Sequence, residues 1–334
     1  MTCPDPVRDI ARAVLYEGYL LWPYTRSTAK NQQRFTFGGV HPAAFAQRYG
    51  DRSQLVMECL LEVPHDASPA RVDVAVRYLH LVDRRPARRE GDRLEPVDEL
   101  LAGGERHLAW EEATEREVAV GPLSLEELRA GCTVPVAVAA GEDVEALGAD
   151  GVLIRRWEAL EGRLVVSGQP LDGNVHLLSV RFVNRCADAV IERAEALRRT
   201  FLSTHVVARA TGAGFVSQTD PPEALRAEAK GCRNEGVWPV LVGEEGRRDT
   251  VLGSPIILSD HPSVAPESPG DLFDGGEIDA LLIHNIRALT DAERDEMRAT
   301  DPRVREILDR SIGLAPEEML DLYGAVRDMR PLDS

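Results

Sequence analysis

Runs of residues in which apolar and polar side chains alternate are the feature that most constrains the fold of this chain. The clearest run covers residues 71–82, where Val72, Val74 and Val76 share one face and Asp73 lies on the other. A period of two residues is typical of a β-strand with one buried face. Further strands are expected at 55–63, 134–139, 151–157, 163–171, 176–184, 237–242 and 251–258. These segments predict an α+β protein with a β-rich body of mostly antiparallel strands and a C-terminal helical tail.

Turn residues support the antiparallel arrangement. The sequence Asp172-Gly-Asn174 is typical of a tight hairpin turn between two of these strands. A second hairpin, closed by residues 211–214, is expected to join strands at 201–210 and 215–218. Residues 84–89 hold four arginines and a proline, so we expect a loop there.

Helices are expected where capping residues precede apolar residues at helical spacing. Thr290-Asp-Ala-Glu293 has the pattern of a capping box, and Asp301-Pro302 is a typical helix start. Other helices are expected to begin near Pro6, to cover 187–200, to follow Asp220 at 221–231 and to follow Asp274 at 275–288. We therefore predict three parts of the chain: a β-rich N-terminal part at 1–185, an α+β C-terminal part packed on it at 186–289, and an acidic helical tail at 290–334.

The charge balance limits the partners. The 334 residues include 39 Lys and Arg against 56 Asp and Glu, which gives a net charge of −17. Such a surface repels phosphate backbones and anionic lipids, so no nucleic acid partner is expected. Only Lys30 and Lys230 are lysines, a bias typical of a GC-rich bacterial genome. Because the sequence shows no leader and no long apolar run, we expect a soluble, cytoplasmic protein without a transmembrane segment.

Motifs that carry chemistry are weak in this sequence. The five cysteines are never closer than 46 residues, which favours neither a zinc knuckle nor a disulfide framework. The sequence has no glycine-rich nucleotide loop, no His-Glu-x-x-His and no Gly-x-Ser-x-Gly. We therefore predict no cofactor. Catalysis by Cys232 or Ser203 with His205 is a weaker hypothesis, because the dipole at the end of an expected helix disfavours a thiolate at Cys232.

The first candidate site follows the N-terminal helix and combines phenol hydroxyls with cations. Arg26, Lys30 and Arg34 recur every four residues, so on a helix they would share one face. In an acidic protein, such a stripe suits an anionic ligand or an acidic partner surface. The alternative is that the cations pair with the chain's own carboxylates and the tyrosines pack at the edge of a core. The predicted binding residues are Tyr16, Tyr19, Tyr24, Arg26, Lys30, Asn31 and Arg34.

The second candidate is a metal site in the loop between a buried strand and the helix expected at 275–288. Histidine and carboxylate side chains bind divalent metals, and loops at strand ends often carry sites. Asp274 is however already explained as a helix cap, and the loop prolines give no defined ligand spacing. We therefore predict no metal, and keep as the alternative a site formed by His205, Asp260, His261, Glu267 and Asp271.

Two long passages carry a family resemblance. The first joins Leu15-Tyr-Glu-Gly-Tyr-Leu-Leu-Trp-Pro-Tyr24 to Lys30-Asn-Gln-Gln-Arg34-Phe-Thr-Phe-Gly38, and the second runs from Ser254-Pro-Ile-Ile to Glu277-Ile-Asp279. They resemble an uncharacterised bacterial family, mostly actinobacterial, whose genes are associated with clusters for uptake nickel-iron hydrogenases and their maturation factors. The resemblance covers residues 12–40 and 200–310, and it implies an accessory or assembly protein without assigning a role to any residue.

Three functional hypotheses follow. The first is an accessory, assembly or structural protein that binds nickel-iron hydrogenase subunits or a maturation intermediate and has no catalysis of its own. The second is a metal-dependent, hydrolase-like enzyme that uses the histidine and carboxylate site. The third is the subunit of a structural homo-oligomer. The acidic surface, the cationic first site and the weak catalytic motifs favour the first hypothesis.

Overall fold

The computed structural model describes most of the chain. The described residues are 6–26, 28–32, 34–64, 69–149, 151–187, 192–263, 272–273, 279–315, 318–319 and 322.

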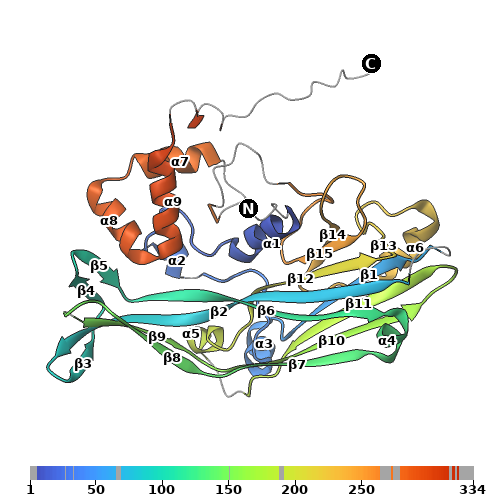
Figure 1. Ribbon diagram of the computed structural model, residues 1–334, viewed down its shortest axis with the longest axis horizontal. Helices are drawn as coiled ribbons and strands as arrows, with labels where there is room; N and C mark the ends of the chain where they lie inside the picture. Colours follow the sequence, from blue (N-terminus) through green and yellow to red (C-terminus); the bar gives the residue numbers. More distant parts are fainter. Residues whose placement is uncertain are drawn as a thin grey trace.

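Two β-sheets pack face to face in the body of the molecule (Figure 1). All of their pairings are antiparallel. The first sheet holds, in spatial order, β13 (Gly214–Phe215), β1 (Gln54–Glu62), β11 (Val175–Asn184), β10 (Leu160–Pro170) and β7 (Cys132–Val138). The second holds β14 (Trp238–Leu241), β15 (Thr250–Ser254), β12 (Leu202–Thr211), β2 (Arg71–Glu90), β9 (Gly151–Trp157) and β8 (Gly141–Ala146).

The long strand β2 organises the second sheet. Strands β12 and β9 pair with one edge of β2, and β3 (Arg93–Pro96) and β6 (Trp110–Ser124) pair with the other edge. A separate hairpin of β4 (Glu99–Ala102) and β5 (Glu105–Leu108) lies between these two strands in the sequence. Alternation along β2 sends Val72, Val74 and Val76 into the core between the sheets, where each is at most 1% exposed. The α+β fold class with mostly antiparallel strands is therefore confirmed.

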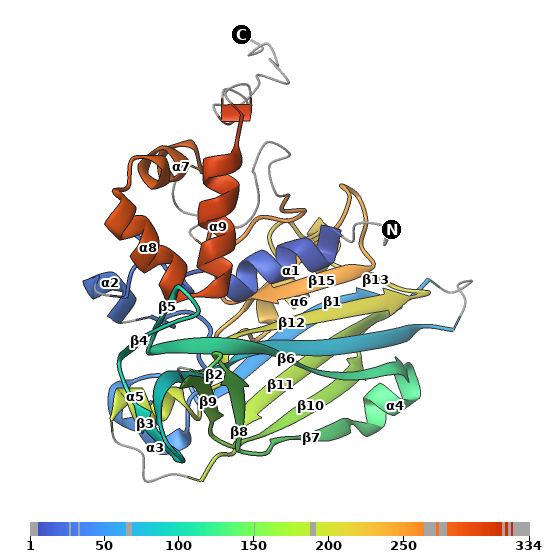
Figure 2. The same ribbon diagram turned by 60° about the vertical axis from the view of Figure 1, so that its left-hand side comes forward.

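Helices α1 (Pro6–Tyr16), α7 (Asp279–Arg287), α8 (Asp291–Thr300) and α9 (Pro302–Gly313) lie on the outer side of the second sheet. Figures 1 and 2 show α1 and the C-terminal helices on the same side of the two sheets. They cover a second core that includes Leu79 and Leu81 of β2. The other helices are α2 (Ala29–Gln32), α3 (Ala43–Tyr49), α4 (Leu125–Ala130), α5 (Arg193–Leu197), η1 (Glu223–Leu225) and α6 (Arg226–Gly231).

Local signals predicted several helix starts and one turn. Thr290 and Glu293 form the expected capping box of α8, and the Asp301 side chain accepts a hydrogen bond from the Arg303 amide at the start of α9. The Asp172-Gly-Asn174 turn joins β10 and β11 as an antiparallel pair, with Gly173 at a φ of +70°. These predictions are confirmed.

The predicted loop at 84–89 is wrong, because these residues continue β2. Arg84 is 5% exposed and forms an ion pair of 2.7 Å with Glu112 of β6. It also donates to the carbonyl oxygens of Ala299 and Thr300 at the end of α8. The arginine-rich segment stays a strand because neighbouring strands and helices supply acceptors for this buried charge.

The second predicted hairpin is also wrong. Strand β13 pairs with β1 in the first sheet, whereas β12 pairs with β2 in the second, so the chain crosses between the sheets at 212–213. Asp220 is not the predicted cap, since Pro222 precedes η1 without a side-chain cap. Of the helix expected at 187–200, the structure describes residues 187 and 192–200, and within these α5 covers 193–197. The predicted cap Asp274 lies outside the described residues.

Strands from both sides of the predicted boundary at residue 185 share the same sheets. Strand β12 lies between β2 and β15, and Phe215 of β13 is fully buried against β1.

Among the described residues, no helix has the length and apolar character needed to span a membrane.

Candidate functional site

The tyrosines of the first predicted site are buried. Tyr16, Tyr19 and Tyr24 are each at most 1% exposed. Tyr19 donates its hydroxyl proton to Asp301 at 2.8 Å, and Tyr24 donates to the Leu272 carbonyl at 2.7 Å. Burial and the Asp301 charge raise the pKa of Tyr19 well above its usual value. Tyr19 therefore stays protonated and joins the N-terminal segment to the start of α9.

The predicted stripe of three cations does not form, because α2 contains only Lys30 of the three. Arg34 is 6% exposed, and its guanidinium lies 3.8 Å from the centre of the Trp110 ring. Arg26 donates to the Ala109 carbonyl at 3.1 Å, whereas Lys30 is exposed. The buried Asn31 side chain bonds the main chain of Leu21 and Thr25. The motif thus forms part of a core.

Arg34 is held by main-chain acceptors as well as by the Trp110 ring. It donates to the Tyr19 carbonyl at 3.3 Å and to the Glu111 carbonyl at 2.5 Å. Burial lowers the pKa of Arg34, while Tyr19 and Glu111 oppose that shift. This arrangement gives the charge a structural role rather than leaving it free for a partner.

The described residues of the alternative metal site have other partners. Asp260 accepts hydrogen bonds from Thr219 at 2.7 Å and from the Leu241 amide at 2.8 Å. The His261 ring lies 3.3 Å from the Gly243 carbonyl. Fully buried His205 contacts the Ser203 carbonyl through Nδ1 at 3.1 Å. The remaining residues, Glu267 and Asp271, lie outside the described residues. Within the described ranges, no three His, Cys, Asp or Glu side chains form a group that could hold a metal ion.

Cys232, the nucleophile of the weaker hypothesis, has partners other than His205. Its Sγ contacts the Glu228 carbonyl at 3.6 Å and the Gln218 amide at 3.7 Å. Burial raises the pKa of this thiol, so the reactive thiolate is disfavoured. The geometry therefore gives no support to a cysteine nucleophile at this position.

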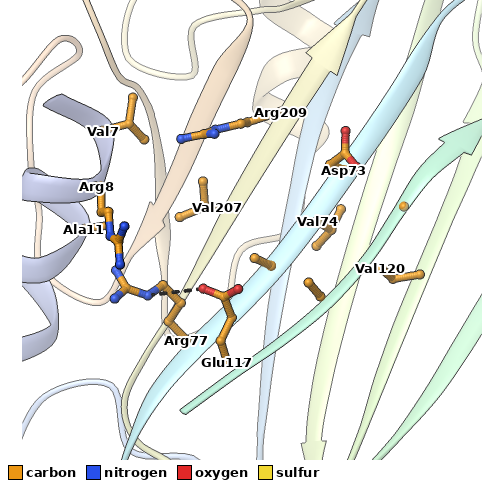
Figure 3. A pocket seen from close by; sticks show the side chains of 13 residues that line it. Val7, Arg8, Ala11, Asp73, Val74, Arg77, Glu117, Val120, Val207 and Arg209 are labelled. Atoms are coloured by element: carbon orange, nitrogen blue, oxygen red, sulfur yellow. Dashed lines mark ion pairs between the residues drawn. The ribbon is translucent and has the colours of Figure 1, made fainter. Parts of the chain in front are cut away.

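A groove between α1 and the outer face of the second sheet brings together charges that the sequence keeps far apart. Its volume is about 670 Å³, and Arg8, Arg77 and Arg209 line it with Asp73 and Glu117 (Figure 3). We call this feature the arginine groove. Three cations therefore line one concave surface in a chain whose net charge is −17.

The pleat of the sheet places these side chains. Because alternate residues of β2 fill the core, Asp73, Ala75 and Arg77 lie on its outer face. Arg209 of β12 is in register with Asp73, and Glu117 of β6 is in register with Arg77. The groove is hollow at its centre because small side chains form its floor there. These include Ala75, Ala119 and Val207.

Helix α1 forms the wall of the arginine groove. Ile10 and Val14 pack on a small core with Val240 of β14, Val242 just after that strand, and Leu252 of β15. This packing leaves Arg8 on the side of the helix that borders the groove. Figure 3 shows the Arg8 side chain extending from α1 toward Arg77.

Arg77 and Arg8, which lie at the same end of the arginine groove, differ in how their charges are held (Figure 3). Arg77 has a side chain only 12% exposed, and it pairs with Glu115 at 3.2 Å and with Glu117 at 3.5 Å. Glu115 also accepts the Tyr16 hydroxyl at 2.8 Å. Exposed Arg8 forms no ion pair within the described ranges. The groove therefore has a fixed cation at its floor and an exposed cation on its wall.

Sequence reasoning missed this site because its members are spread over about 200 positions. The pairing of β2 with β6 and β12, together with the packing of α1, brings them together. The available signal was the placement of Arg77 and Arg209 on the outer face of strands whose inner faces are valine and alanine.

Comparisons with protein-family models, with curated protein sequences and with solved structures found no match to this chain.

Proposed function

We propose that this chain is a non-catalytic accessory protein, and that its arginine groove binds an anionic surface of a nickel-iron hydrogenase subunit or maturation intermediate. The observation that carries the binding role is the convergence of Arg8, Arg77 and Arg209 on one groove of an otherwise acidic molecule. The choice of partner rests on the family resemblance. We also propose that the protein is cytoplasmic.

The chemistry of the groove supports binding. Its titratable lining residues are arginines and carboxylates, and guanidinium groups bind carboxylates or phosphates through paired hydrogen bonds. The surrounding negative charge of the protein repels anions elsewhere, so an anionic partner is directed toward this groove.

Co-purification tests the proposal. The tagged chain is expressed with the large and small subunits of a nickel-iron hydrogenase, with and without the maturation factors. A groove variant, Arg8→Gln with Arg209→Gln, changes two exposed cations. A control variant, Arg163→Gln with Arg181→Gln, removes the same charge from exposed positions of the first sheet.

We expect the wild type and the control variant to retain a hydrogenase subunit or a maturation intermediate, and the groove variant to retain clearly less. Equal retention by all three proteins would assign binding to another surface. Failure of the wild type to retain any of these proteins would remove the hydrogenase partner from the proposal.

The metal-dependent hydrolase stays a prediction with its own test. Elemental analysis of the purified chain would support it if about one transition metal ion remained bound per chain, as in a protein with a dedicated ligand set.

A further inference from the structure

The arginine groove has cations at two separated positions, and this spacing restricts the ligand. Arg209 lies opposite Asp73, whereas Arg77 lies four residues further along β2. At about 3.3 Å per residue, the two positions are about 13 Å apart along the strands. A compact anion therefore contacts one end of the groove only.

The floor between these positions is apolar and built from small side chains. Ala75 and Val207 are a cross-strand pair, and Ala119 lies opposite Ala75 on the other side. Such a floor accommodates the small or branched side chains of a ligand that runs along the sheet. It offers no polar group to a continuous polyanion.

The carboxylates of the groove argue against a dense polyanion. Asp73 and Glu117 lie among the arginines and would repel the successive phosphates of a nucleic acid. They accept hydrogen bonds, and a peptide supplies amide N–H donors at regular intervals. The mixture of cations and acceptors therefore matches a peptide that carries well-separated acids.

We infer that the arginine groove binds an extended acidic peptide segment of the partner, with two carboxylates four residues apart. One carboxylate binds the exposed Arg8 beside the ion-paired Arg77, and the other binds Arg209. In an extended chain, residues four apart are also about 13 Å apart and point to the same side. This inference rests on the proposed function, since it names the part of the partner that enters the groove.

Synthetic peptides test this spacing. Blocked, fluorescently labelled peptides contain Glu-Ala-Thr-Val-Glu, with acids four residues apart, or Glu-Glu-Ala-Thr-Val, with adjacent acids of equal total charge. A third peptide, Gln-Ala-Thr-Val-Gln, has no acid. Fluorescence anisotropy measures their affinities for the full chain, for the groove variant and for the control variant, with inorganic phosphate as a competitor.

We expect the peptide with separated acids to bind about fivefold more tightly than the one with adjacent acids, because only the former contacts both ends. The affinity of the groove variant for the peptide with separated acids should be at least fivefold lower than that of the wild type. The control variant should bind this peptide like the wild type. A circular dichroism melt near that of the wild type shows that the groove variant is folded.

Equal affinity for the two acidic peptides would overturn the inference, and so would displacement by phosphate as effective as displacement by peptide. If hydrogenase proteins are lost from the groove variant but no peptide binds, the peptide inference fails and the proposed function stands. If the spacing dependence is observed but hydrogenase proteins do not co-purify, the groove ligand is supported and the proposed partner fails.

Discussion

Arg34 lies between the Trp110 ring and two main-chain carbonyl groups, so its charge is held inside the molecule. Lys30, four residues earlier, is exposed. The two residues look equivalent in the sequence because residue type and spacing do not show which cation the fold encloses. That difference depends on Trp110 and Glu111, which are about 80 positions away.

Arg34→Gln should reduce the free energy of unfolding by roughly 2–4 kcal/mol, because it leaves the Tyr19 and Glu111 carbonyl groups without a charged donor and removes the stacking on Trp110. Lys30→Gln should change it by less than about 0.5 kcal/mol. Urea unfolding of both variants measures the difference. Equal urea midpoints for the two variants would contradict a stabilising role for the Arg34 contacts.

Buried histidines make stability depend on pH. Burial lowers the pKa of His205 to about 4, and Arg77 adds to the shift. The unfolded chain takes up this proton near pH 6.5, whereas the folded chain does not until about pH 4. Stability is therefore lost as the pH falls from about 6.5 to about 4, and the loss is complete below the lower value.

His205→Gln should remove about 3 kcal/mol of this acid-dependent loss between pH 7 and pH 4, whatever its effect on stability at pH 7. The wild-type protein, measured over the same pH range, is the comparison. Unfolding free energies measured across this range provide the test. A slope unchanged in His205→Gln would mean that the folded protein protonates this histidine normally.

The two predicted helix caps, Thr290 and Asp301, differ in their surroundings. Thr290 caps α8 at the surface, where its side chain bonds the Glu293 amide. Asp301 caps α9 but is only 1% exposed, and it also accepts the buried Tyr19 hydroxyl. The sequence predicts both caps, while only the packed structure shows the second partner of Asp301.

Thr290→Ala should cost about 0.5–2 kcal/mol, the usual effect of losing a cap. Asp301→Ala should cost more, roughly 2–4 kcal/mol, because it also leaves the Tyr19 hydroxyl without its acceptor. Asp301→Asn keeps the cap and serves as the milder comparison. Thermal unfolding ranks the three variants, and equal losses for the two alanine variants would contradict the role of the Tyr19 contact.

Elements defined by neighbouring residues could be predicted, and those defined by distant pairing could not. The Asp172-Gly-Asn174 turn and the capping box at Thr290 follow from a few adjacent residues. The pairing of β13 with β1 in the first sheet depends on a partner far along the chain, and so does the strand at 84–89. The arginine groove is missed for the same reason, since three separate strands and a helix build it.

At the scale of the whole molecule, both sheets need strands from each half of the chain. Strand β12 is a central strand of the second sheet, and its Val206 and Ala208 are fully buried. A chain that ends at residue 185 would leave the inner faces of β1 and β2 without these partners. The two parts therefore depend on each other for their core.

We expect the fragment 1–185 to lack a cooperative thermal transition, whereas the full chain unfolds cooperatively. Circular dichroism melting and limited proteolysis of the two proteins test this. A fragment that melts in a single sharp transition and resists proteolysis would show that the first part is an independent domain.

The salt dependence of partner binding tests whether the exposed arginines of the groove bind the partner. Affinity for the captured hydrogenase protein is measured from about 50 to about 200 mM salt, a range over which exposed charges become increasingly screened. We expect the affinity of the wild type and of the Arg163→Gln/Arg181→Gln control to fall steeply and in parallel. We expect weaker binding and a flatter salt dependence for Arg8→Gln/Arg209→Gln. Parallel slopes for all three proteins would contradict a role for the arginine groove in binding.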